Sequence, residues 1–299
     1  MYYLYRILGK LPTALLQALS TALFWLVYHV ARYRRAVVAE NLQYAFPEKS
    51  DADRKTLAIN FYKHLCNFLL EMLQSRVLPL TELQRRVRLI NPEVLAPFMA
   101  QKQPILFLTA HQGNWEWLLH VLSERLGCPI DVVYKPLHNR AMDRYMRETR
   151  ARSGNPIPFK DAGREILRHR SDFRCFAMLA DQSPFKRDNR YWRKFFNRSA
   201  SFYLGPQRIA EVGKFPVVYT VIRKVERGSY EVIFEVIGQP PYPRKSHVIL
   251  DRYIDSLEAA IRAQPETWLW SNRKWKHAPT HATDGAENAA ARLQLPNQS

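Results

Sequence analysis

The feature that most constrains the fold is a regular alternation of apolar, strand-like runs with segments of helical spacing. The run PILFLTA at 104–110 is continuously apolar, as expected of a strand covered on both faces. Further strands are predicted at 85–90, 130–134, 173–180, 216–223 and 230–237, and helices at 50–75, 114–126, 141–152, 162–169, 202–212 and 247–262. This alternation predicts an α/β fold in which helices flank a mostly parallel central sheet.

The N-terminus contains a segment of bilayer length. Residues 11–31 carry no formal charge and are mostly Leu, Ala, Val and aromatic residues. At about 1.5 Å per residue such a helix matches a hydrocarbon core of roughly 30 Å. Its polar residues leave open a helix that lies in the membrane interface, and a buried core helix is a further alternative. No small-x-small cleavage site follows the segment, which argues against a cleaved signal peptide. Arg32, Arg34 and Arg35 after it favour a cytoplasmic location for the rest of the chain.

We therefore divide the chain into a membrane anchor at 1–35, a catalytic domain at 36–277 and a polar tail at 278–299 that we expect to be disordered. Cys66, Cys128 and Cys175 lack the C-x-x-C spacing of a zinc site, so we interpret them as free buried thiols and expect no bound metal.

The charge of the chain indicates an acidic partner. Lys and Arg number 45 against 27 Asp and Glu, a formal net charge of +18, while 47% hydrophobic residues exclude a disordered chain. Nucleic acid and an anionic membrane face are the two candidates. The chain lacks the usual nucleic-acid motifs, and its N-terminus favours the membrane.

The aromatic and basic stretch at 268–276 suits either stacking on nucleotides or anchoring at a bilayer; we favour the bilayer. The basic stretch with Lys186, Arg187, Arg190, Arg193, Lys194 and Arg198 is interpreted as a loop that contacts head groups or is simply solvated.

The chemically informative stretch is HQGNWE, directly after the strand at 104–110. His111 lies where a parallel sheet opens to ligands, at the carboxyl end of a strand. Gly113 permits a tight turn, and Asn114 suits a helix N-cap whose free N–H groups could hold an oxyanion. His111 and Glu116 would not share a face of one helix, so we expect His111 in the loop, turned back toward Glu116. Glu116 would then hold one imidazole nitrogen while the other accepts a proton from a hydroxyl.

Several further blocks accompany this stretch in order along the chain. They are Arg35 with Asn41-Leu42 and Ala45-Phe46-Pro47-Glu48, then Tyr134-Lys135-Pro136 with Asn139, Arg150-x-Arg152-x-Gly154, Asp181-Gln182, Phe195-Phe196, and Trp270-x-Asn272-Arg273-Lys274-Trp275-Lys276. Over residues 1–277 the chain resembles the late acyltransferases of lipid A biosynthesis, the lauroyl and myristoyl transferases, within the superfamily marked by His-x4-acid. It departs from many members at Asn272, where they carry His, and at Asn197, where they carry Gly.

The resemblance implies an O-acyltransferase that moves a fatty acyl chain from acidic acyl carrier protein, or acyl-CoA, to a hydroxyl of an anionic, phosphorylated lipid A precursor. It implies no other cofactor and places the enzyme at the bacterial inner membrane, with the catalytic domain on the cytoplasmic face. His111 and Glu116 are the catalytic candidates, and no serine or cysteine nucleophile is expected. The candidates for substrate binding are Asn114, Tyr134, Lys135, Arg147, Arg150, Arg152, Asp181 and Gln182.

For Asp181 and Gln182 the alternatives are bracing of the site or capping of a turn, and for Arg147 a solvated helix face. The alternative functions are acylation of another lipid acceptor, a membrane-tethered nucleic-acid-binding module, and an inactive scaffold of acyltransferase ancestry.

Overall fold

The computed structural model describes residues 1–184, 190–243 and 246–276. The predicted tail at 278–299 and the basic residues Lys186 and Arg187 lie outside these residues. A seven-stranded sheet with the order β1-β9-β8-β2-β5-β3-β4 forms the centre of the molecule. Its strands are β1 (Val87–Leu89), β2 (Leu106–Thr109), β3 (Ile130–Tyr134), β4 (Pro156–Pro158), β5 (Cys175–Leu179), β8 (Val217–Glu226) and β9 (Ser229–Gly238). Neighbours pair in parallel except β8 and β9, so the predicted α/β class with a mostly parallel sheet is confirmed.

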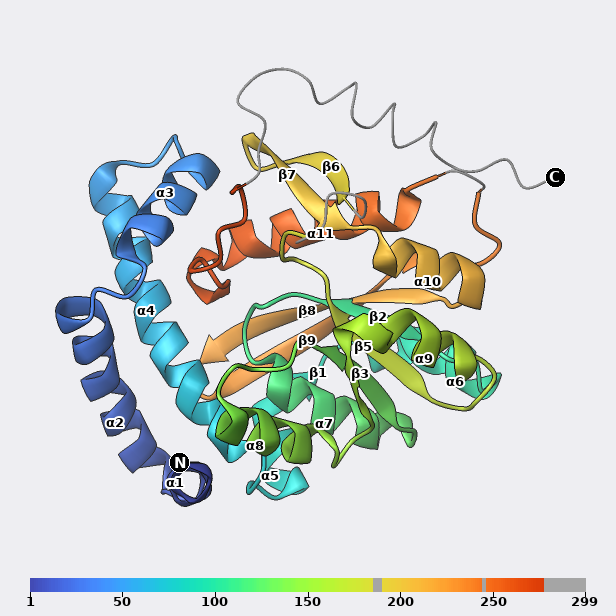
Figure 1. The fold of residues 1–299 in the computed structure, drawn as a ribbon, viewed down its shortest axis with the longest axis horizontal. Coiled ribbons are helices and arrows are strands. Elements are labelled where there is room, and N and C mark those ends of the chain that lie inside the picture. Colours follow the sequence, from blue (N-terminus) through green and yellow to red (C-terminus); the bar gives the residue numbers. More distant parts are fainter. Residues whose placement is uncertain (185–189, 244–245, 277–299) are drawn as a thin grey trace.

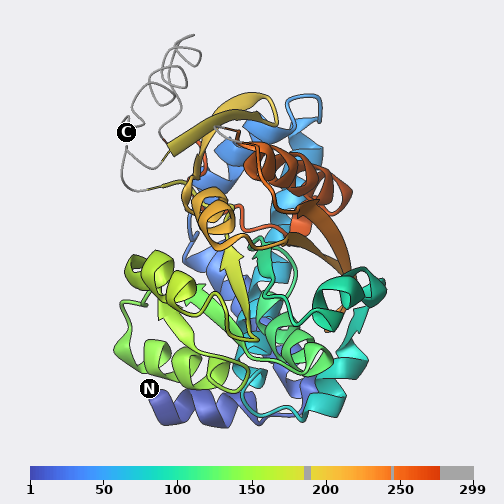
Figure 2. The same cartoon turned by 90° about the vertical axis from the view of Figure 1, so that its right-hand side faces the viewer.

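Helices cover both faces of this sheet (Figures 1 and 2). The helices along the chain are α3 (Arg35–Ala45), α4 (Asp51–Gln74), α5 (Leu80–Arg86), α6 (Ala96–Ala100), α7 (Trp115–Leu126), α8 (Arg140–Arg150), α9 (Ala162–Arg168), α10 (Gly205–Gly213) and α11 (Val248–Ala263), with short 3-10 turns η2 (Pro92–Leu95), η3 (Phe159–Asp161) and η5 (Pro265–Thr267). In β2, Leu106 and Leu108 face the core that contains α10 and α11, whereas Phe107 faces the core that contains α7. This double burial explains why the sequence of β2 is continuously apolar.

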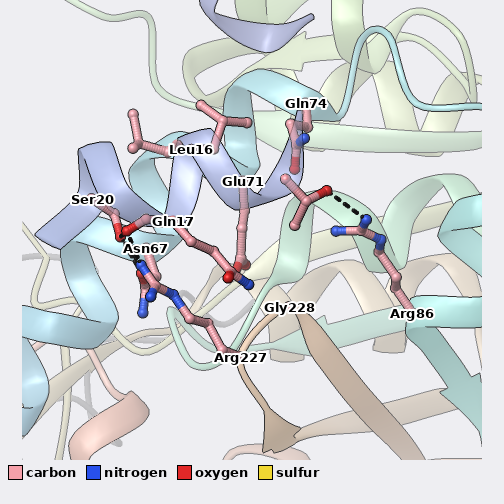
Figure 3. A pocket seen from close by; sticks show the side chains of 11 residues that line it. Leu16, Gln17, Ser20, Asn67, Glu71, Gln74, Arg86, Arg227 and Gly228 are labelled. Atoms are coloured by element: carbon pink, nitrogen blue, oxygen red, sulfur yellow. Dashed lines mark hydrogen bonds between the residues drawn. The ribbon is translucent and has the colours of Figure 1, made fainter. Parts of the chain in front are cut away.

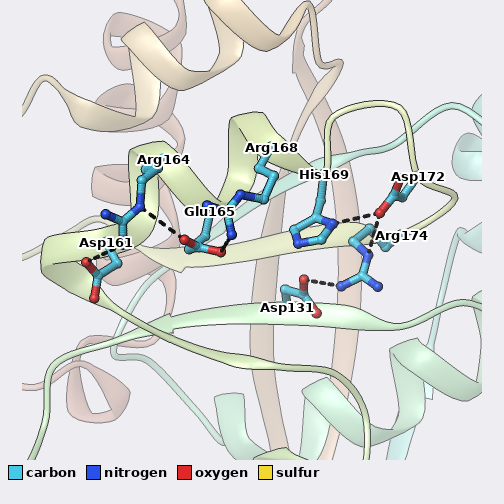
Figure 4. A network of polar contacts seen from close by, with 8 residues as sticks. All are labelled: Asp131, Asp161, Arg164, Glu165, Arg168, His169, Asp172 and Arg174. Carbon is cyan, nitrogen blue, oxygen red and sulfur yellow. Dashed lines mark hydrogen bonds and ion pairs between the residues drawn. The ribbon is translucent and has the colours of Figure 1, made fainter.

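Local signals account for the ends of several elements. Helix α4 begins after Ser50, whose hydroxyl accepts a hydrogen bond from the Asp53 N–H at 3.1 Å, with Asp51 and Asp53 in the first turn. Both proline residues of β4 lie in an edge strand, where a missing N–H costs no ladder bond. At the amino-terminal edges of β3 and β5, Asp131 and Arg174 form an ion pair at 2.7 Å (Figure 4), at the opposite end from the strand ends that carry the candidate site.

The N-terminal segment forms α1 (Tyr2–Gly9), α2 (Thr13–Trp25) and the π-helical η1 (Leu26–Val30). Residues Thr13–Val30 are long and apolar enough to cross a membrane, with 22% of this window buried. In Figure 1, α2 runs alongside α4 at one side of the molecule. Leu16, Ser20, Phe24 and Tyr28 form the buried stripe of α2 and η1. The exposed apolar residues of these two helices are Leu15, Leu19, Trp25, Leu26 and Val30.

Two predictions of secondary structure are wrong in their boundaries. The strand predicted at 85–90 begins only at Val87, because Arg85 and Arg86 end α5. The second difference lies between residues 190 and 205. A helix was expected from Phe202, and the basic stretch before it was expected to be a loop. Instead β6 (Arg190–Phe195) and β7 (Arg198–Tyr203) form an antiparallel hairpin, and α10 begins only at Gly205. The apolar side chains of the hairpin explain this, because Phe195 and Phe202 are fully buried and Phe195 stacks on Trp275. Because so many residues of this stretch are Lys or Arg, its sequence does not show the buried apolar positions that identify a strand.

Candidate active site

The loop between β2 and α7 carries His111 and is held in place by the segment that follows α11. The Leu269 N–H donates to the His111 carbonyl at 3.0 Å, and the Gly113 N–H donates to the Thr267 carbonyl at 3.2 Å. Gly113 has a φ of +62°, and a Cβ there would lie 2.5 Å from Ile222 Cγ2. Both the backbone angle and the contact therefore require glycine where this loop turns.

The side chain of His111 contacts Asp181. Its Nδ1 lies 2.7 Å from Asp181 Oδ1, and its backbone N–H donates to Asp181 Oδ2 at 3.1 Å. The sheet brings the two together, because β2 pairs with β5 in the register Thr109↔Leu179. His111 and Asp181 are each two residues beyond this pair, at the carboxyl ends of neighbouring strands.

This contact determines which imidazole nitrogen is basic. Burial raises the pKa of Asp181, but the His111 ring and further hydrogen bonds outweigh burial and hold that pKa below its usual value. An ionised carboxylate only accepts hydrogen bonds, so Nδ1 carries the proton. In the neutral ring Nε2 then holds the lone pair, 3.2 Å from the side-chain amide nitrogen of Gln182. The His111 side chain keeps 18% of its surface exposed, which leaves it accessible to a reactant.

Glu116 does not hold His111, and this part of the prediction is wrong. Its carboxylate forms a two-pronged ion pair with Arg150, at 2.6 Å from Nη2 and 3.1 Å from Nε. Glu116 lies in the first turn of α7 and is 3% exposed. The physical reason is topological: α8 ends beside the start of α7 and supplies the guanidinium, whereas β5, adjacent to β2, supplies the acid for His111.

Trp115 connects Glu116 with His111 indirectly. Its indole N–H donates to Glu116 Oε1 at 3.1 Å, and its ring meets the His111 ring edge-on at a centroid distance of 5.1 Å. Burial raises the pKa of Glu116, but the Arg150 charge and hydrogen bonds bring it below the usual value. Glu116 is thus a buried anion that orients the indole against His111.

Asn114 is a structural residue in this loop and does not offer its side chain to a substrate. Its Oδ1 accepts from the Trp117 N–H at 3.0 Å, which confirms the predicted N-cap, and its Nδ2 donates to Glu71 Oε2 at 2.9 Å. Asn114 has no exposed surface, and both its Oδ1 and its Nδ2 form hydrogen bonds within the protein. In place of the predicted role in substrate binding, the side chain positions α7 against α4.

The basic candidates occupy different environments. Arg150 is 13% exposed and committed to Glu116, which speaks against the predicted free phosphate ligand. Arg152 donates to the Ser75 carbonyl at 2.6 Å, and Arg147 is exposed on α8. The guanidinium of Arg150 lies 5.7 Å from the centre of the half-buried Tyr134 ring, and Lys135 is exposed just beyond β3.

The aromatic and basic stretch at 268–276 is mostly core, so its predicted anchoring at a bilayer is wrong. Trp268, Trp270 and Trp275 are 1%, 0% and 5% exposed. The Trp268 indole N–H donates to Asp181 Oδ2 at 2.8 Å, a contact that sequence reasoning missed. Tryptophan spacing alone does not distinguish a core cluster from a membrane belt.

Lys274 is a second residue whose environment the sequence did not reveal. It is 1% exposed; its ammonium donates to the Ser201 carbonyl at 2.8 Å and lies 3.3 Å from the centre of the Phe202 ring. Burial lowers its pKa to about 7, although Asp181 acts in the opposite direction. Across the described ranges, no group of three or more His, Cys, Asp or Glu side chains is arranged to hold a metal ion.

Comparison with known proteins identifies the family. The family model described as bacterial lipid A biosynthesis acyltransferase matches residues 2–277. The chain belongs to this family. It is 22% identical to a lipid A biosynthesis acyltransferase of Haemophilus influenzae over 270 residues, covering 88% of this chain and 82% of that protein.

Two relatives from Escherichia coli are similarly distant. The chain is 20% identical to a lipid A biosynthesis palmitoleoyltransferase and 22% identical to a lipid A biosynthesis lauroyltransferase, covering 90% of this chain and 88% of each relative. The sequence resemblance is thereby confirmed, and the chain is an acyltransferase. The match to the family model extends from the N-terminal helices through Trp275, so it includes both ends of the described chain.

Proposed function

We propose that this acyltransferase moves a fatty acyl chain from acyl carrier protein to a hydroxyl of a phosphorylated lipid A precursor by direct attack. The observation that carries the mechanism is the Asp181–His111 contact, which places the proton on Nδ1 and the lone pair on Nε2. With its proton on Nδ1, the imidazole keeps a lone pair on Nε2, 3.2 Å from the Gln182 amide nitrogen, and its partial exposure lets a reactant take the place of that contact, as a general base requires.

In the proposed step, His111 Nε2 accepts the proton of the acceptor hydroxyl as its oxygen attacks the thioester carbonyl. The tetrahedral intermediate collapses, the carbon–sulfur bond breaks, and the imidazolium returns the proton to the thiolate of the carrier. Asp181 stabilises the imidazolium that forms between the two steps, as a carboxylate does in other acyl-transfer sites. The acyl group passes directly from the thioester to the acceptor oxygen and is never bound covalently to the enzyme.

Glu116 contributes in this proposal as a positioning residue. Through Arg150 and Trp115 it fixes the position of the indole that faces the imidazole. The start of α7 offers backbone N–H groups for the oxyanion; those of His111, Gly113 and Trp117 are already bonded within the protein, so Trp115 and Glu116 are the candidates for this role.

The charge of the chain supports the proposed partners. A net charge of +18 attracts both an acidic carrier protein and a phosphorylated acceptor. Among the predicted phosphate ligands, Lys135 lies just beyond β3, Arg147 on α8 and Arg152 two residues after α8. We retain these three as the acceptor side of the site.

The exposed apolar face of α2 supports membrane association. The basic residues Arg32, Arg34 and Arg35 after this segment are the reason for proposing that the catalytic domain lies on the cytoplasmic face of the inner membrane.

The test compares single turnover by His111→Ala and Asp181→Asn with an acyl-carrier thioester as the donor. We expect the rate to fall by about 10²–10⁴ in each, because one variant lacks the base and the other leaves it without its orienting charge. The double variant should be little worse than His111→Ala, since the two groups act as one unit.

The control is Asp172→Asn, an exposed carboxylate that also contacts a histidine ring, His169, and it should retain full activity. Intact-protein mass spectrometry should find no acyl group on the chain. Near-normal turnover in folded Asp181→Asn, or a stable acyl-enzyme, would contradict the mechanism.

A further inference from the structure

A cavity of about 580 Å³ lies between the N-terminal helices and the catalytic domain. One wall belongs to α2 and η1, a second to α4, and a third to the turn between β8 and β9. Aromatic and apolar side chains form much of the lining. They are Phe24, Trp25, Tyr28 and Ile59.

The same cavity gathers three positive charges. Lys63 from α4, and Lys224 and Arg227 from the β8–β9 hairpin, line it, and none of its lining residues is Asp or Glu. The buried carboxylate of Glu71, in the neighbouring pocket, acts electrostatically on Lys224 and Arg227, but among the described residues none of the three cations lies within ion-pair distance of a carboxylate. A cluster of cations beside apolar walls matches a ligand with an anionic head and hydrocarbon chains.

Arg227 is held in place by the N-terminal helix. Its Nε donates to Asn67 Oδ1 at 2.9 Å, and its Nη2 donates to the Gln17 carbonyl and to the Ser20 hydroxyl. Figure 3 shows Arg227 beside Ser20 and Asn67 in a small neighbouring pocket, which shares these three residues with the cavity. The guanidinium is thus pre-positioned, which reduces the entropy lost when a ligand binds.

The cavity is separate from the candidate active site. Lys63 and Asn67 line it, whereas the next residues along α4, His64 and Phe68, contact the catalytic loop. Phe68 lies against Trp115 at a centroid distance of 4.0 Å, and His64 contacts the Gly113 backbone. The two sites are therefore neighbours along α4 that are lined by different residues of this helix.

The cavity also adjoins the apolar outer surface of α2 and η1. Trp25 lines it and is 58% exposed, and Leu26 and Val30 beside it are 53% and 73% exposed. A ligand with acyl chains in the bilayer would reach it laterally. The π-helical turn at Leu26–Val30 forms part of this wall, a local irregularity that is frequent at functional sites.

We propose that this cavity binds one anionic glycerophospholipid of the surrounding bilayer. Its phosphate lies among Lys63, Lys224 and Arg227, and its chains pack against Phe24, Trp25 and Tyr28. The bound lipid joins the N-terminal helices to the catalytic domain. The inference requires membrane association but not the proposed acyl transfer, because the site takes no part in the reaction.

The test uses the full chain in detergent micelles that contain phosphatidylglycerol with brominated acyl chains, which quench nearby tryptophan. We expect brominated phosphatidylglycerol to quench tryptophan fluorescence in a saturable way, and the Trp25→Phe variant to lose most of this quenching. Brominated phosphatidylcholine should give no saturable quenching. Lys63→Gln/Lys224→Gln should weaken the apparent affinity by about tenfold or more, since each charge-assisted bond contributes measurably. The matched control is Lys55→Gln/Lys160→Gln, which removes two exposed cations outside the cavity.

Lys63→Arg/Lys224→Arg serves as a second variant that keeps the charges, and it should bind phosphatidylglycerol nearly as well as the parent chain. Circular dichroism verifies the fold of each variant. Equal quenching by the two lipids, or an equal loss in the control pair, would overturn the proposal. So would displacement of the probe by a phosphorylated glucosamine lipid at concentrations where unlabelled phosphatidylglycerol has no effect, because the cavity would then belong to the acceptor.

Discussion

The two buried carboxylates around the catalytic loop each accept hydrogen bonds from two partner residues. Asp181 receives hydrogen bonds from His111 and the Trp268 indole, and Glu116 receives them from Arg150 and Trp115. A buried anion without such partners would be strongly destabilising. Lys274 differs, because its ammonium has a carbonyl and aromatic rings around it, so its environment favours loss of the proton.

The pKa of about 7 for Lys274 predicts a pH dependence of stability. Lysine in the unfolded chain titrates near 10.4, so between about pH 7 and 10 the unfolded state binds more protons than the folded state. This residue therefore adds stability as the pH rises through that window, by up to about 1.4 kcal/mol per pH unit, and loses it as the pH falls.

Lys274→Met should flatten this slope relative to the parent chain and raise the free energy of unfolding at pH 7 and below. Denaturant unfolding of the detergent-solubilised protein from pH 6 to 10 measures it, with exposed Lys55→Met as the control. Parallel pH profiles for the parent chain and Lys274→Met would refute a depressed pKa.

At the scale of elements, the site is assembled from the carboxyl ends of β2 and β5 and from the facing ends of α7 and α8. The strands place His111 opposite Asp181, and the helices place Glu116 opposite Arg150. The ion pair between α7 and α8 is buried, so removal of one partner leaves an unpaired buried charge and lowers the free energy of unfolding strongly. The pair thereby holds these two helices together beside the imidazole.

Glu116→Gln should lower the free energy of unfolding by about 3–5 kcal/mol, because it leaves the Arg150 guanidinium buried without a counter-charge. The double variant Glu116→Gln/Arg150→Met should recover most of this loss, since no unpaired charge remains. The control is Glu165→Gln in the exposed arginine network of α9 (Figure 4), which should cost less than about 1 kcal/mol. Denaturant unfolding measures all three, and additive losses in the double variant would rule out this account.

Across the whole molecule, the two ends of the described chain are joined. Asn41 donates to the Trp270 and Asn272 carbonyls at 2.7 and 2.6 Å, and Arg34 donates to the Ser271 carbonyl at 2.9 Å. The N-terminal helices add a buried stripe against α4 while their opposite face stays apolar and exposed. Such a helix, lying lengthwise on the domain, is suited to rest in a membrane interface with its outer face in the lipid.

Leu15→Lys/Leu19→Lys should shift the protein from the membrane fraction toward the soluble fraction without unfolding it. These residues are 53% and 36% exposed on the outer face of α2, so the added charges are unfavourable in lipid but not in the folded core. Carbonate extraction followed by centrifugation measures the distribution. Ile90→Lys/Val212→Lys, at exposed apolar residues elsewhere, should stay in the membrane fraction; release of both variants alike would show that α2 is not the membrane contact.

Local patterns in the sequence were sufficient for the class of fold and for the location of the catalytic loop. These patterns are the apolar run at 104–110, the N-caps Ser50 and Asn114, and the alternation of strands and helices. All three depend on residues that are close in sequence, so they can be predicted from the sequence directly. The same patterns placed His111 at a strand end.

The tertiary structure alone decided which acid meets His111, because that depends on strand order. β3 follows β2 in the chain, yet β5 lies between them in the sheet, so Asp181 reaches the imidazole, whereas Glu116, only five residues from His111, turns to Arg150 on α8. Likewise, the sequence around Trp268 and Lys274 is typical of a membrane-surface segment, but both residues are buried in the core. Burial of a residue is set by what packs on it, and for these residues the packing partners come from β6, β7 and the end of β5, which are distant in sequence.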